Sequence, residues 1–430
     1  MNVILRQRLR HLKNSNTTTA GYWLRCMSTL ETIELNGRNY KKDHMTNVPQ
    51  NIINRLNKQL HNTKDHPLEI VKSKIVDYFH GYFRNRHGGC VFASIDNISP
   101  VVTVQQNFDN LLVPKDHVSR SKNDNYYIND LQMLRAHTTA HEIDLISSGW
   151  NAFLNTGDCY RRDAIDKSHF PVFHQLEGVR IFDDFELFEE TKDNSLRILE
   201  KTASMRTEEK QAEHTIDAAR ITEFNLKYTL MKLVENLFGD NVEMRWVDAY
   251  FPFTHPSWEL EVKLNGEWME MLGCGILEQQ ILKYAGAGDR IGWAFGLGLE
   301  RFAMKLFDIP DIRLFWSEDE RFLKQFKTGV DTTFQPFSKY PPSYKDISFW
   351  VNDGNFSSND LFEIARSVGG DVIEEMTLVD QFVHPKTQRE SHCYRITYRA
   401  MDRTLRDEEV NDVQNKLRSE AAKLLHIELR

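Results

Sequence analysis

Two short segments of the sequence carry side chains whose types and spacing suit the binding of a polyanion. Residues 290–301 pack three glycines against an apolar run and end in Arg301. Glycine allows the backbone to approach a ligand closely, and an arginine at the start of a helix would present a fixed cation to it. Gly296 and Gly298 match two glycines of a dinucleotide-binding loop, but Arg301 stands where the third is needed and no βαβ pattern surrounds it. A P-loop is excluded too, because no G-x-x-x-x-G-K-[S/T] occurs in the chain.

The second segment, residues 158–177, predicts a strand–loop–strand hairpin that gathers polar groups over one face of a sheet. Phe173, Gln175 and Glu177 share parity along the second strand, so their side chains would point the same way. Two adjacent arginines, the first of them Arg161, precede them. Arginine offers the forked donors that a phosphate needs, an aromatic ring can stack a purine, and a carboxylate accepts from an ammonium group. From composition alone, a surface hairpin with ordinary ion pairs stays open as the alternative.

The elements that must hold these segments are indicated by apolar periodicity and by turn residues. A helix is expected from Pro67, with Asp65 as its candidate cap, and a second amphipathic helix has Gly239 as its stop signal. A charged stretch at 189–214 has little apolar content and is expected to be a solvated insertion. Asn265-Gly266 is a strong hairpin signal. The expected elements of this part are helices from residue 67, over 221–238 and through 306, and strands over 244–249, 258–264 and 267–272.

The C-terminal part of the chain predicts a separate module. Three prolines lie in residues 327–345, which have little apolar periodicity and form the best linker candidate. We therefore expect an α+β protein in which the module is separable from the part that carries the two polyanion segments. The module reads strand (349–352), helix (358–368), strand (372–382), strand (393–400), helix (407–425) and strand (427–429), the order of a ferredoxin-like βαββαβ fold.

Length and composition narrow the class of protein. The chain has 430 residues, enough for two or three domains, of which 40% are apolar and 27% charged. No apolar run approaches the roughly 18 residues of a membrane span. The formal net charge of −8 argues against a generic polyanion binder, so any contact with nucleic acid needs local basic patches. Five cysteines without a C-x-x-C pair argue against a zinc ribbon or a disulfide framework and favour a reducing compartment.

The first thirty residues differ from the rest of the chain. They hold five Lys or Arg residues and several Ser and Thr, and no acidic residue precedes Glu31. Three leucines among them fall at helical spacing. This composition is typical of a mitochondrial transit peptide, so we expect a transit peptide over 1–28, cleavage near 25–30 and a mature protein in the mitochondrial matrix. A disordered basic tail is the alternative.

Both polyanion segments resemble motifs of class II aminoacyl-tRNA synthetases. Residues 290–301 look like motif 3 of that class. Tyr-Arg-Arg-Asp at 160–163 and His-x-Pro-x-Phe-His-Gln-x-Glu at 169–177 closely resemble motif 2 of phenylalanyl-tRNA synthetases. The resemblance runs from about residue 66 to the C-terminus, is specific only as a joint set of motifs, and implies an antiparallel sheet flanked by helices. Further segments similar to that family are 106–109, 114–117, 134–141, 250–256 and 271–275.

The resemblance implies an ATP site with named roles. Arg161 would hold the α-phosphate and Arg301 the γ-phosphate side, and these two form the catalytic pair. Phe173 would stack the adenine, and Arg301 could cover its other face. His169 would help to hold the phosphates, and Mg²⁺ would accompany ATP, with no protein metal ligand assigned. The implied ATP-binding set is Arg161, Asp163, His169, Phe173, Glu270 and Arg301.

The resemblance also implies a phenylalanine site. Gln175 and Glu177 would grip the ammonium group, Phe251 and Phe253 would pack edge-to-face on the substrate ring, and Ala294 would form the wall near its para position. Two positions depart from the expected family form: serine is common where Thr139 stands, and glutamine where Glu142 stands, so the role of Glu142 is open. The implied set is His137, Thr139, Ala140, His141, Glu142, Ser168, Phe170, Gln175, Leu176, Glu177, Phe251, Phe253, Ala294 and Phe295.

The implied activity is that of a phenylalanine–tRNA ligase, which makes phenylalanyl-adenylate from ATP and transfers phenylalanine to the terminal ribose of mitochondrial tRNA(Phe). The resemblance is closest to the single-chain mitochondrial form and implies a monomer with no obligate protein partner and no membrane contact. In this family the ferredoxin-like module binds the anticodon, and Arg395, Arg399 and Arg403 are its candidate contacts. The expected division of the chain is 1–28 transit peptide, 29–65 extension, 66–326 catalytic domain, 327–339 linker and 340–430 anticodon-binding domain.

Two other functions were open. A non-catalytic, synthetase-like RNA-binding protein would be marked by loss of Arg161, Arg301 or Glu177, and all three are present. A ligase that activates a different carboxylate on the same fold is disfavoured by the aromatic pair around Pro252 and by Ala294.

Overall fold

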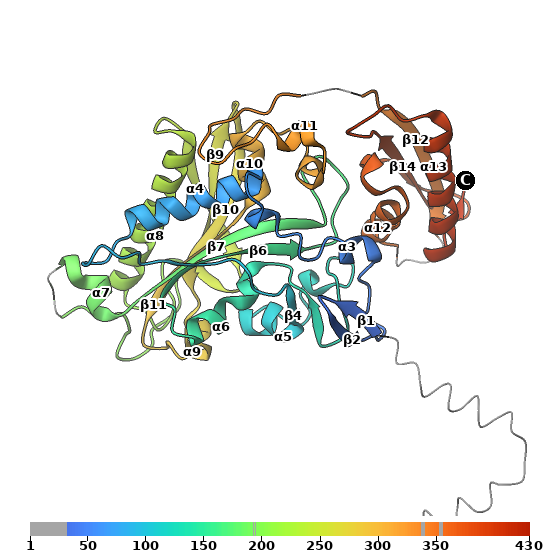
Figure 1. Ribbon diagram of the computed structural model, residues 1–430. Coiled ribbons are helices and arrows are strands. Elements are labelled where there is room, and N and C mark those ends of the chain that lie inside the picture. Colours follow the sequence, from blue (N-terminus) through green and yellow to red (C-terminus); the bar gives the residue numbers. More distant parts are fainter. Residues whose placement is uncertain (1–31, 192, 194, 337–339, 352–355) are drawn as a thin grey trace, which may run out of the picture.

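The computed structural model describes residues 32–191, 193, 195–336, 340–351 and 356–430 (Figure 1). The expected transit peptide, residues 1–28, lies outside them and stays a prediction. Within the described residues, no helix has the length and apolar character that crossing a membrane requires.

A seven-stranded sheet forms the centre of the larger domain, in the order β3-β6-β7-β11-β10-β9-β8. The edge pair β3 and β6 is parallel and the other neighbours are antiparallel, which confirms the expected antiparallel sheet. β6 and β7 form the predicted hairpin, with Tyr160 paired to Val172 at its loop end. The strands are β3 (Ala93–Ile95), β6 (Ala152–Tyr160), β7 (Val172–Phe182), β8 (Met244–Phe251), β9 (Thr254–Leu264), β10 (Glu267–Leu277) and β11 (Ile291–Gly298).

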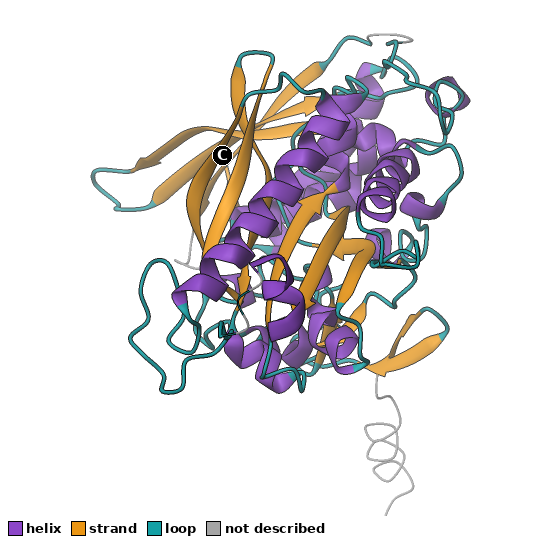
Figure 2. Ribbon diagram, turned by 90° about the vertical axis from the view of Figure 1, so that its left-hand side faces the viewer, coloured by secondary structure: helices purple, strands orange, loops and turns teal. Residues whose placement is uncertain are grey.

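Three helices pack against one face of this sheet, where Figure 2 shows them crossing the strands. They are α4 (Pro67–Tyr82), α8 (Ile216–Phe238) and α10 (Leu299–Leu306). Their apolar faces and the facing strands form the largest hydrophobic core, which includes Phe79, Leu230 and Phe302. Burying this many apolar side chains on one face fixes the strand register, because a one-residue slip would turn each of them to the opposite face.

The ends of these helices follow from their sequence, with one correction. α8 ends at Phe238 before Gly239, and α4 begins at Pro67, as predicted. The cap of α4 is His66 rather than Asp65: the His66 ring nitrogen Nδ1 accepts from the backbone N–H of Leu68 at 3.2 Å. His66 has the extended backbone that a cap residue requires, and it directly precedes the first helical residue.

Short elements complete the larger domain. The helical turn η4 contacts both β6 and β7, so it stands next to the polar hairpin face. Figure 1 shows α5 and α6 across β6 and β7 from α4. These elements are β1 (Thr32–Leu35), β2 (Arg38–Lys41), α3 (Gln50–Ile53), η1 (Leu60–Asn62), β4 (Val101–Thr103), α5 (Val104–Asn107), η2 (Asp109–Leu111), η3 (Val118–Arg120), β5 (Gln132–Leu134), η4 (Thr138–His141), α6 (Glu142–Ser147), α7 (Asp184–Phe188), η5 (Glu189–Thr191), α9 (Gln279–Tyr284), η6 (Ile312–Trp316) and α11 (Glu320–Leu323).

The charged stretch at 189–214 is not simply a solvated insertion. Ile198 is fully buried in the main core. The Gln211 amide donates to the backbone oxygens of His255 at 2.8 Å and Leu277 at 2.9 Å, and its side chain is 1% exposed. The expectation failed because a few buried side chains anchor a segment whose average composition is polar.

The C-terminal domain has the predicted βαββαβ order. Its four strands pair in the order β13-β14-β12-β15, and all pairs are antiparallel. Helices α12 and α13 contact each other and pack over a core that includes Ile347, Leu361 and Leu417. This arrangement confirms the ferredoxin-like domain. Its elements are β12 (Ser343–Val351), α12 (Ser358–Gly369), η7 (Gly370–Val372), β13 (Ile373–Val383), β14 (Glu390–Tyr398), α13 (Asp407–Leu424) and β15 (Glu428–Leu429).

The C-terminal domain is docked on the loop that joins β6 and β7, so it contacts one of the two polyanion segments. Ile165 of this loop is 6% exposed and packs into the C-terminal core. Its backbone oxygen accepts from the N–H of Met376 at 3.0 Å. Arg162 of the same loop pairs with Asp360 of α12 at 2.8 Å. Proline content alone indicated a boundary in the chain but carried no information on which surfaces meet in space.

Candidate active site

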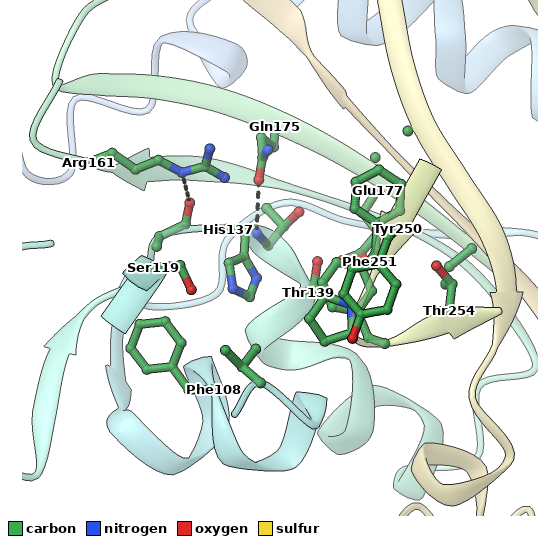
Figure 3. Close-up of a pocket in the computed structure, with 18 of the residues that line it drawn as sticks. Phe108, Ser119, His137, Thr139, Arg161, Gln175, Glu177, Tyr250, Phe251 and Thr254 are labelled. Carbon is green, nitrogen blue, oxygen red and sulfur yellow. Dashed lines mark hydrogen bonds between the residues drawn. The ribbon is translucent and has the colours of Figure 1, made fainter. Parts of the chain in front are cut away.

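A cavity of about 600 Å³ opens over the sheet face opposite α4 and α8 (Figure 3). It is lined from β7, β10, β11, η4 and the turn between β8 and β9. Its position follows from the parity of β7: Leu176 points into the main core, whereas Gln175 and Glu177 point into the cavity.

Two stacked aromatic rings form one side of the cavity. Phe251 and Phe253 lie with their ring centroids 5.9 Å apart and their planes at 12°. A Cβ at Gly273 would lie 2.8 Å from Cζ of Phe251, so glycine is what allows this ring to lie against β10. The ring of His137 is stacked 6.3 Å from that of Phe253. Such a wall suits an aromatic side chain of a ligand.

Ala294 contributes a small wall residue. It lies on β11, paired with Gly275 on β10 and with Val179 on β7, and lines the cavity at 4% exposure. Because its neighbours on both sides are strands of the same sheet, a larger side chain here would take volume from the cavity. The sequence-predicted ring site is therefore brought together at Phe251, Phe253 and Ala294.

Gln175 and Glu177 form a polar end of the same cavity. The Thr138 backbone N–H donates to Oε1 of Gln175 at 3.2 Å, which fixes the amide. Glu177 is 3% exposed, and its Oε2 has no hydrogen-bond donor among the described residues. Burial raises the pKa of Glu177 to about 7. A carboxylate oxygen without a donor at a cavity suits an ammonium group, which brings only donors.

A second cavity of about 270 Å³ adjoins the first, because Arg161, Gln175, Glu270 and Gly296 line both. Its further lining includes Asp163, Ser168, His169, Phe170, Phe173 and Arg301. The predicted ATP-binding residues thus gather in one place, next to the predicted amino-acid site.

Arg161 stands at the junction of the two cavities. Its Nε donates to the backbone oxygen of Ala136 at 2.8 Å, and its guanidinium lies 5.1 Å from the centroid of the Phe173 ring. The backbone bond fixes one side of the guanidinium and leaves its other donors for a ligand. Phe173 offers its face, so a planar base could stack there in place of the guanidinium.

Arg301 lies at the start of α10 and is held across the second cavity. Its Nη1 donates to the backbone oxygen of Glu270 at 2.7 Å and lies 3.5 Å from the carboxylate of that residue. Glu300, its neighbour, accepts from the backbone N–H and from the ring Nδ1 of His174, the latter at 2.7 Å. This buried pair ties the motif 3 helix to the motif 2 strand and thereby sets the distance between the two arginines.

His169 is placed to meet a negative charge. Its Nδ1 pairs with Asp166 at 2.7 Å, and this hydrogen bond raises the pKa of His169 above its usual value. The imidazole is half exposed and faces the second cavity. A raised pKa favours the cationic ring, which suits a phosphate.

Several predicted phenylalanine-site residues do not line the first cavity. Leu176 has its side chain in the main core because alternate residues of a strand face opposite sides. Phe295 lines the cavity as predicted, but its ring packs into the main core, where it stacks on Phe79 at 5.6 Å. Ala140 packs into a small apolar cluster, and the ring of His141 lies 3.0 Å from Nη1 of Arg135. Ser168 and Phe170 line the second cavity instead.

The remaining members of that set hold their expected place or lie directly behind it. His137 and Thr139 line the first cavity, and Glu142 is fully buried beside Glu177. Sequence reasoning missed several lining residues, although three of them fall within the segments that resemble the family at 106–109, 114–117 and 250–256. The missed lining residues include Phe108, His117, Ser119 and Tyr250.

The three candidate tRNA contacts are each paired with an acidic residue. Arg395 pairs with Asp346 at 2.9 Å, and Arg403 pairs with Glu409. Arg399 lies 3.1 Å from Glu374, which also lies 3.4 Å from Arg313 of the larger domain. Arg399 therefore stands at the docked face, whereas Arg395 is about half exposed on the sheet.

Family comparisons place both domains in one class of enzyme. The model of the class II core domain of tRNA synthetases (F) matches residues 51–216 and 199–326, and that of the ferredoxin-fold anticodon binding domain matches residues 338–430. The chain belongs to the class II aminoacyl-tRNA synthetases.

Curated relatives narrow the class to one family. The chain is 54% identical over 402 residues to "Phenylalanine–tRNA ligase, mitochondrial" of Mus musculus, which covers 93% of this chain and 89% of that protein. It is 40% identical over 464 residues to the protein of the same name of Saccharomyces cerevisiae, with 94% and 97% covered. A probable mitochondrial phenylalanine–tRNA ligase of Drosophila melanogaster is 46% identical, with 93% and 92% covered. The chain thus belongs to the mitochondrial phenylalanine–tRNA ligase family.

Proposed function

We propose that this chain activates phenylalanine with ATP in the two adjoining cavities and then transfers it to tRNA(Phe) in the mitochondrial matrix, as a monomer. The observation that carries the proposal is the shared lining of the cavities by Arg161 and Gln175. A ring packed against Phe251 and Phe253 and an ammonium at Glu177 leave the carboxylate of phenylalanine directed toward Arg161. An α-phosphate held by Arg161 then meets that carboxylate.

The reaction needs no protein nucleophile. A carboxylate oxygen of phenylalanine attacks the α-phosphorus of ATP in line, the bond to the bridging oxygen breaks, and pyrophosphate leaves with the electron pair. Arg161 neutralises charge at the α-phosphate, while Arg301 and His169 hold the leaving side, so catalysis is positioning plus charge stabilisation. In the second step the 2′-OH of the terminal ribose of tRNA attacks the adenylate carbonyl, AMP leaves, and the hydroxyl proton is released.

Mg²⁺ fits beside the second cavity. Glu259 and Glu270 lie on the neighbouring strands β9 and β10, and burial together with the charge of Glu270 raises the pKa of Glu259. Two carboxylates that repel one another suit a divalent cation, which Mg²⁺ sites in proteins typically share with substrate phosphates. Glu259 and Glu270 would hold the ion, and the ion would neutralise charge on the phosphates.

A non-catalytic RNA-binding protein is not favoured, because both arginines and Glu177 stand at the cavities. The deciding experiment is ATP–pyrophosphate exchange with each of the twenty amino acids. We expect exchange with phenylalanine and a much weaker response to tyrosine. Arg301→Ala should lower kcat/KM by at least about 100-fold, as loss of a transition-state charge contact does. Exchange with no amino acid would support the RNA-binding alternative, and a strong preference for another amino acid would contradict the assignment of the ring pocket.

The ferredoxin-like domain is assigned to the anticodon stem. Residues 386–406 hold six Lys or Arg residues and two acidic ones. In β14, Tyr394, Ile396 and Tyr398 are buried, whereas Arg395 is exposed, so one face packs while the other presents this cation. Arg399 follows the strand and is half-buried at the docked face. Phosphate contacts of this kind make binding depend on salt.

A further inference from the structure

Two glutamates lie buried together at the ammonium end of the first cavity. Glu142 is the first residue of α6, and Glu177 lies in the middle of β7. Their exposed fractions are 0% and 3%. They approach within hydrogen-bonding range of each other, which contributes to the shifted pKa of both. Because Glu177 lines the cavity and Glu142 stands behind it, a ligand cation that meets one carboxyl also acts on the other.

The surroundings supply too few donors for two charged carboxylates. Both carboxyl oxygens of Glu142 and Oε2 of Glu177 have no hydrogen-bond donor among the described residues. The hydroxyl groups of Thr138 and Thr139 interact with Glu177 and not with Glu142. Two adjacent buried carboxylates with three of their four oxygens unpartnered cannot both ionise at moderate cost, so such a pair retains one proton between them.

Burial raises the pKa of both carboxyl groups, whereas their interaction raises the pKa of Glu142 and lowers that of Glu177. Burial raises the pKa of Glu177 to about 7. Burial and then the charge of Glu177 raise the pKa of Glu142 well above its usual range. The protons of two such groups are lost in steps that belong to the pair rather than to either residue.

Among the residues that the structure describes, no other group packed around the pair explains a proton released near neutral pH. Burial lowers the pKa of His137 and of His141 to about 3, so both rings are neutral. Asp158 on β6 has a lowered pKa and is paired with Arg135 at 2.6 Å. Burial raises the pKa of Cys159 to about 12 and also raises the pKa of Cys274, so both thiols stay protonated. The other titratable or charged groups on the surrounding elements are Arg161, Tyr250, Glu270 and the exposed Asp144.

We propose that Glu142 and Glu177 act as a one-proton pair that gives up its proton to solvent when the ammonium group of phenylalanine binds. The proposal rests on the function proposed above and makes Glu142 a positioning residue that acts through Glu177. The ammonium brings one positive charge and three donors to the unpartnered oxygens, which stabilises the second carboxylate. The proton leaves to water and no covalent bond to carbon or phosphorus changes.

The consequence is a binding constant that depends on pH. Below the pH at which the free pair loses its proton, each binding event releases up to one proton, so affinity for phenylalanine rises by up to about tenfold per pH unit. Above that pH the pair is already fully ionised, and affinity becomes independent of this group. The amino acid keeps its ammonium form throughout this range, so the dependence belongs to the protein.

The test is calorimetry of phenylalanine binding to the full chain, without ATP or tRNA, in phosphate and in Tris at pH 6.5. The difference in binding enthalpy between buffers of unlike ionisation enthalpy counts the protons released. We expect a release approaching one proton. Glu142→Gln should still bind phenylalanine, should release fewer protons than the wild type, and should show an affinity that depends less on pH between about pH 6 and 8. The reason is that a glutamine amide cannot carry the shared proton and can donate to the Glu177 carboxylate, which favours the ionised form of Glu177.

Asp144→Asn is the matched control, since it removes a carboxylate from the exposed side of the same helix and should leave the proton count unchanged. Melting temperatures of both variants show whether they fold. Phenylalanine that binds the wild type without releasing a proton overturns the proposal and leaves the proposed function intact. An unchanged proton count in folded Glu142→Gln overturns it as well, whereas failure of phenylalanine to bind the wild type overturns the proposed function.

Discussion

Replacing Ile165 by alanine tests whether the docked C-terminal domain holds the motif 2 loop in its working position. Ile165 is 6% exposed, and its side chain packs among residues of the C-terminal core. The same loop carries Asp163 and His169 into the second cavity. If docking orders this loop, weaker docking should weaken ATP binding more than phenylalanine binding.

The size of the effect follows from burial. Truncating a buried isoleucine to alanine costs about 2–5 kcal/mol of stability. Ile165 is buried only when the C-terminal domain is docked, so this change destabilises the docked state and not the undocked one. The docking equilibrium constant should then fall by roughly 30- to 5,000-fold. KM for ATP in pyrophosphate exchange should rise, while KM for phenylalanine should change little, because Phe251 and Phe253 lie on strands and turns away from the loop.

Ile427→Ala is the control for this experiment. Ile427 is also 6% exposed and belongs to the same core, but it lies outside the loop. It should lower the melting temperature of the C-terminal domain without a comparable change in KM for ATP. Small-angle X-ray scattering reports docking independently. An Ile165→Ala protein that scatters as an extended molecule and yet keeps its KM for ATP would refute the reasoning, because the loop would then be ordered without the domain.

Three further outcomes are expected. Ala294→Gly should admit para-chlorophenylalanine in pyrophosphate exchange, since an apolar pocket otherwise discriminates by only about 10²-fold, and no gain would show that Ala294 is not the wall. Arg395→Ala combined with Arg399→Ala should weaken tRNA binding in a filter assay and flatten its salt dependence with phenylalanine KM unchanged; an unaltered salt slope would contradict the assigned surface. Without ligand, stability should fall as pH rises from about 5 to 7, because the folded-state pKa of Glu177 is about 7, above its unfolded value, so that the folded state binds more protons there. Thermal melting should show this slope, and a slope as steep in Glu177→Gln would assign it to other groups.

The sequence predicted those parts of the site that depend on local pattern. Strand parity alone placed Phe173, Gln175 and Glu177 on one face, and the sheet confirms this, because Leu176 between them enters the core. The glycine-rich segment that ends at Gly298 likewise predicted that a helix begins near Arg301, and α10 begins at Leu299. Such features survive because one strand or one helix determines them.

Features that depend on contacts between distant segments could not be predicted in the same way. The resemblance implied that Phe295 lines the phenylalanine site, and it does line the cavity, but its ring packs into the core because adjacent residues of β11 face opposite sides of the sheet. The docking of Ile165 could not be inferred either, because a single apolar residue in a polar loop is not part of a helical or strand periodicity that would indicate which surface it packs against. Only the pairing of two surfaces in space shows what covers it.

Glu142 illustrates how burial can make an ambiguous residue informative. From the sequence its role was open, and as the first residue of α6 it could face solvent, because the helix dipole stabilises a carboxylate near a helix N-terminus. In the structure it is fully buried beside a second carboxyl and has no donor among the described residues. Leaving such a group in place is costly for the free protein, whereas a ligand ammonium at Glu177 offsets that cost. The free-energy cost of burying Glu142 therefore links the stability of the fold, the protonation of the glutamate pair and the binding of the substrate ammonium at one end of the cavity.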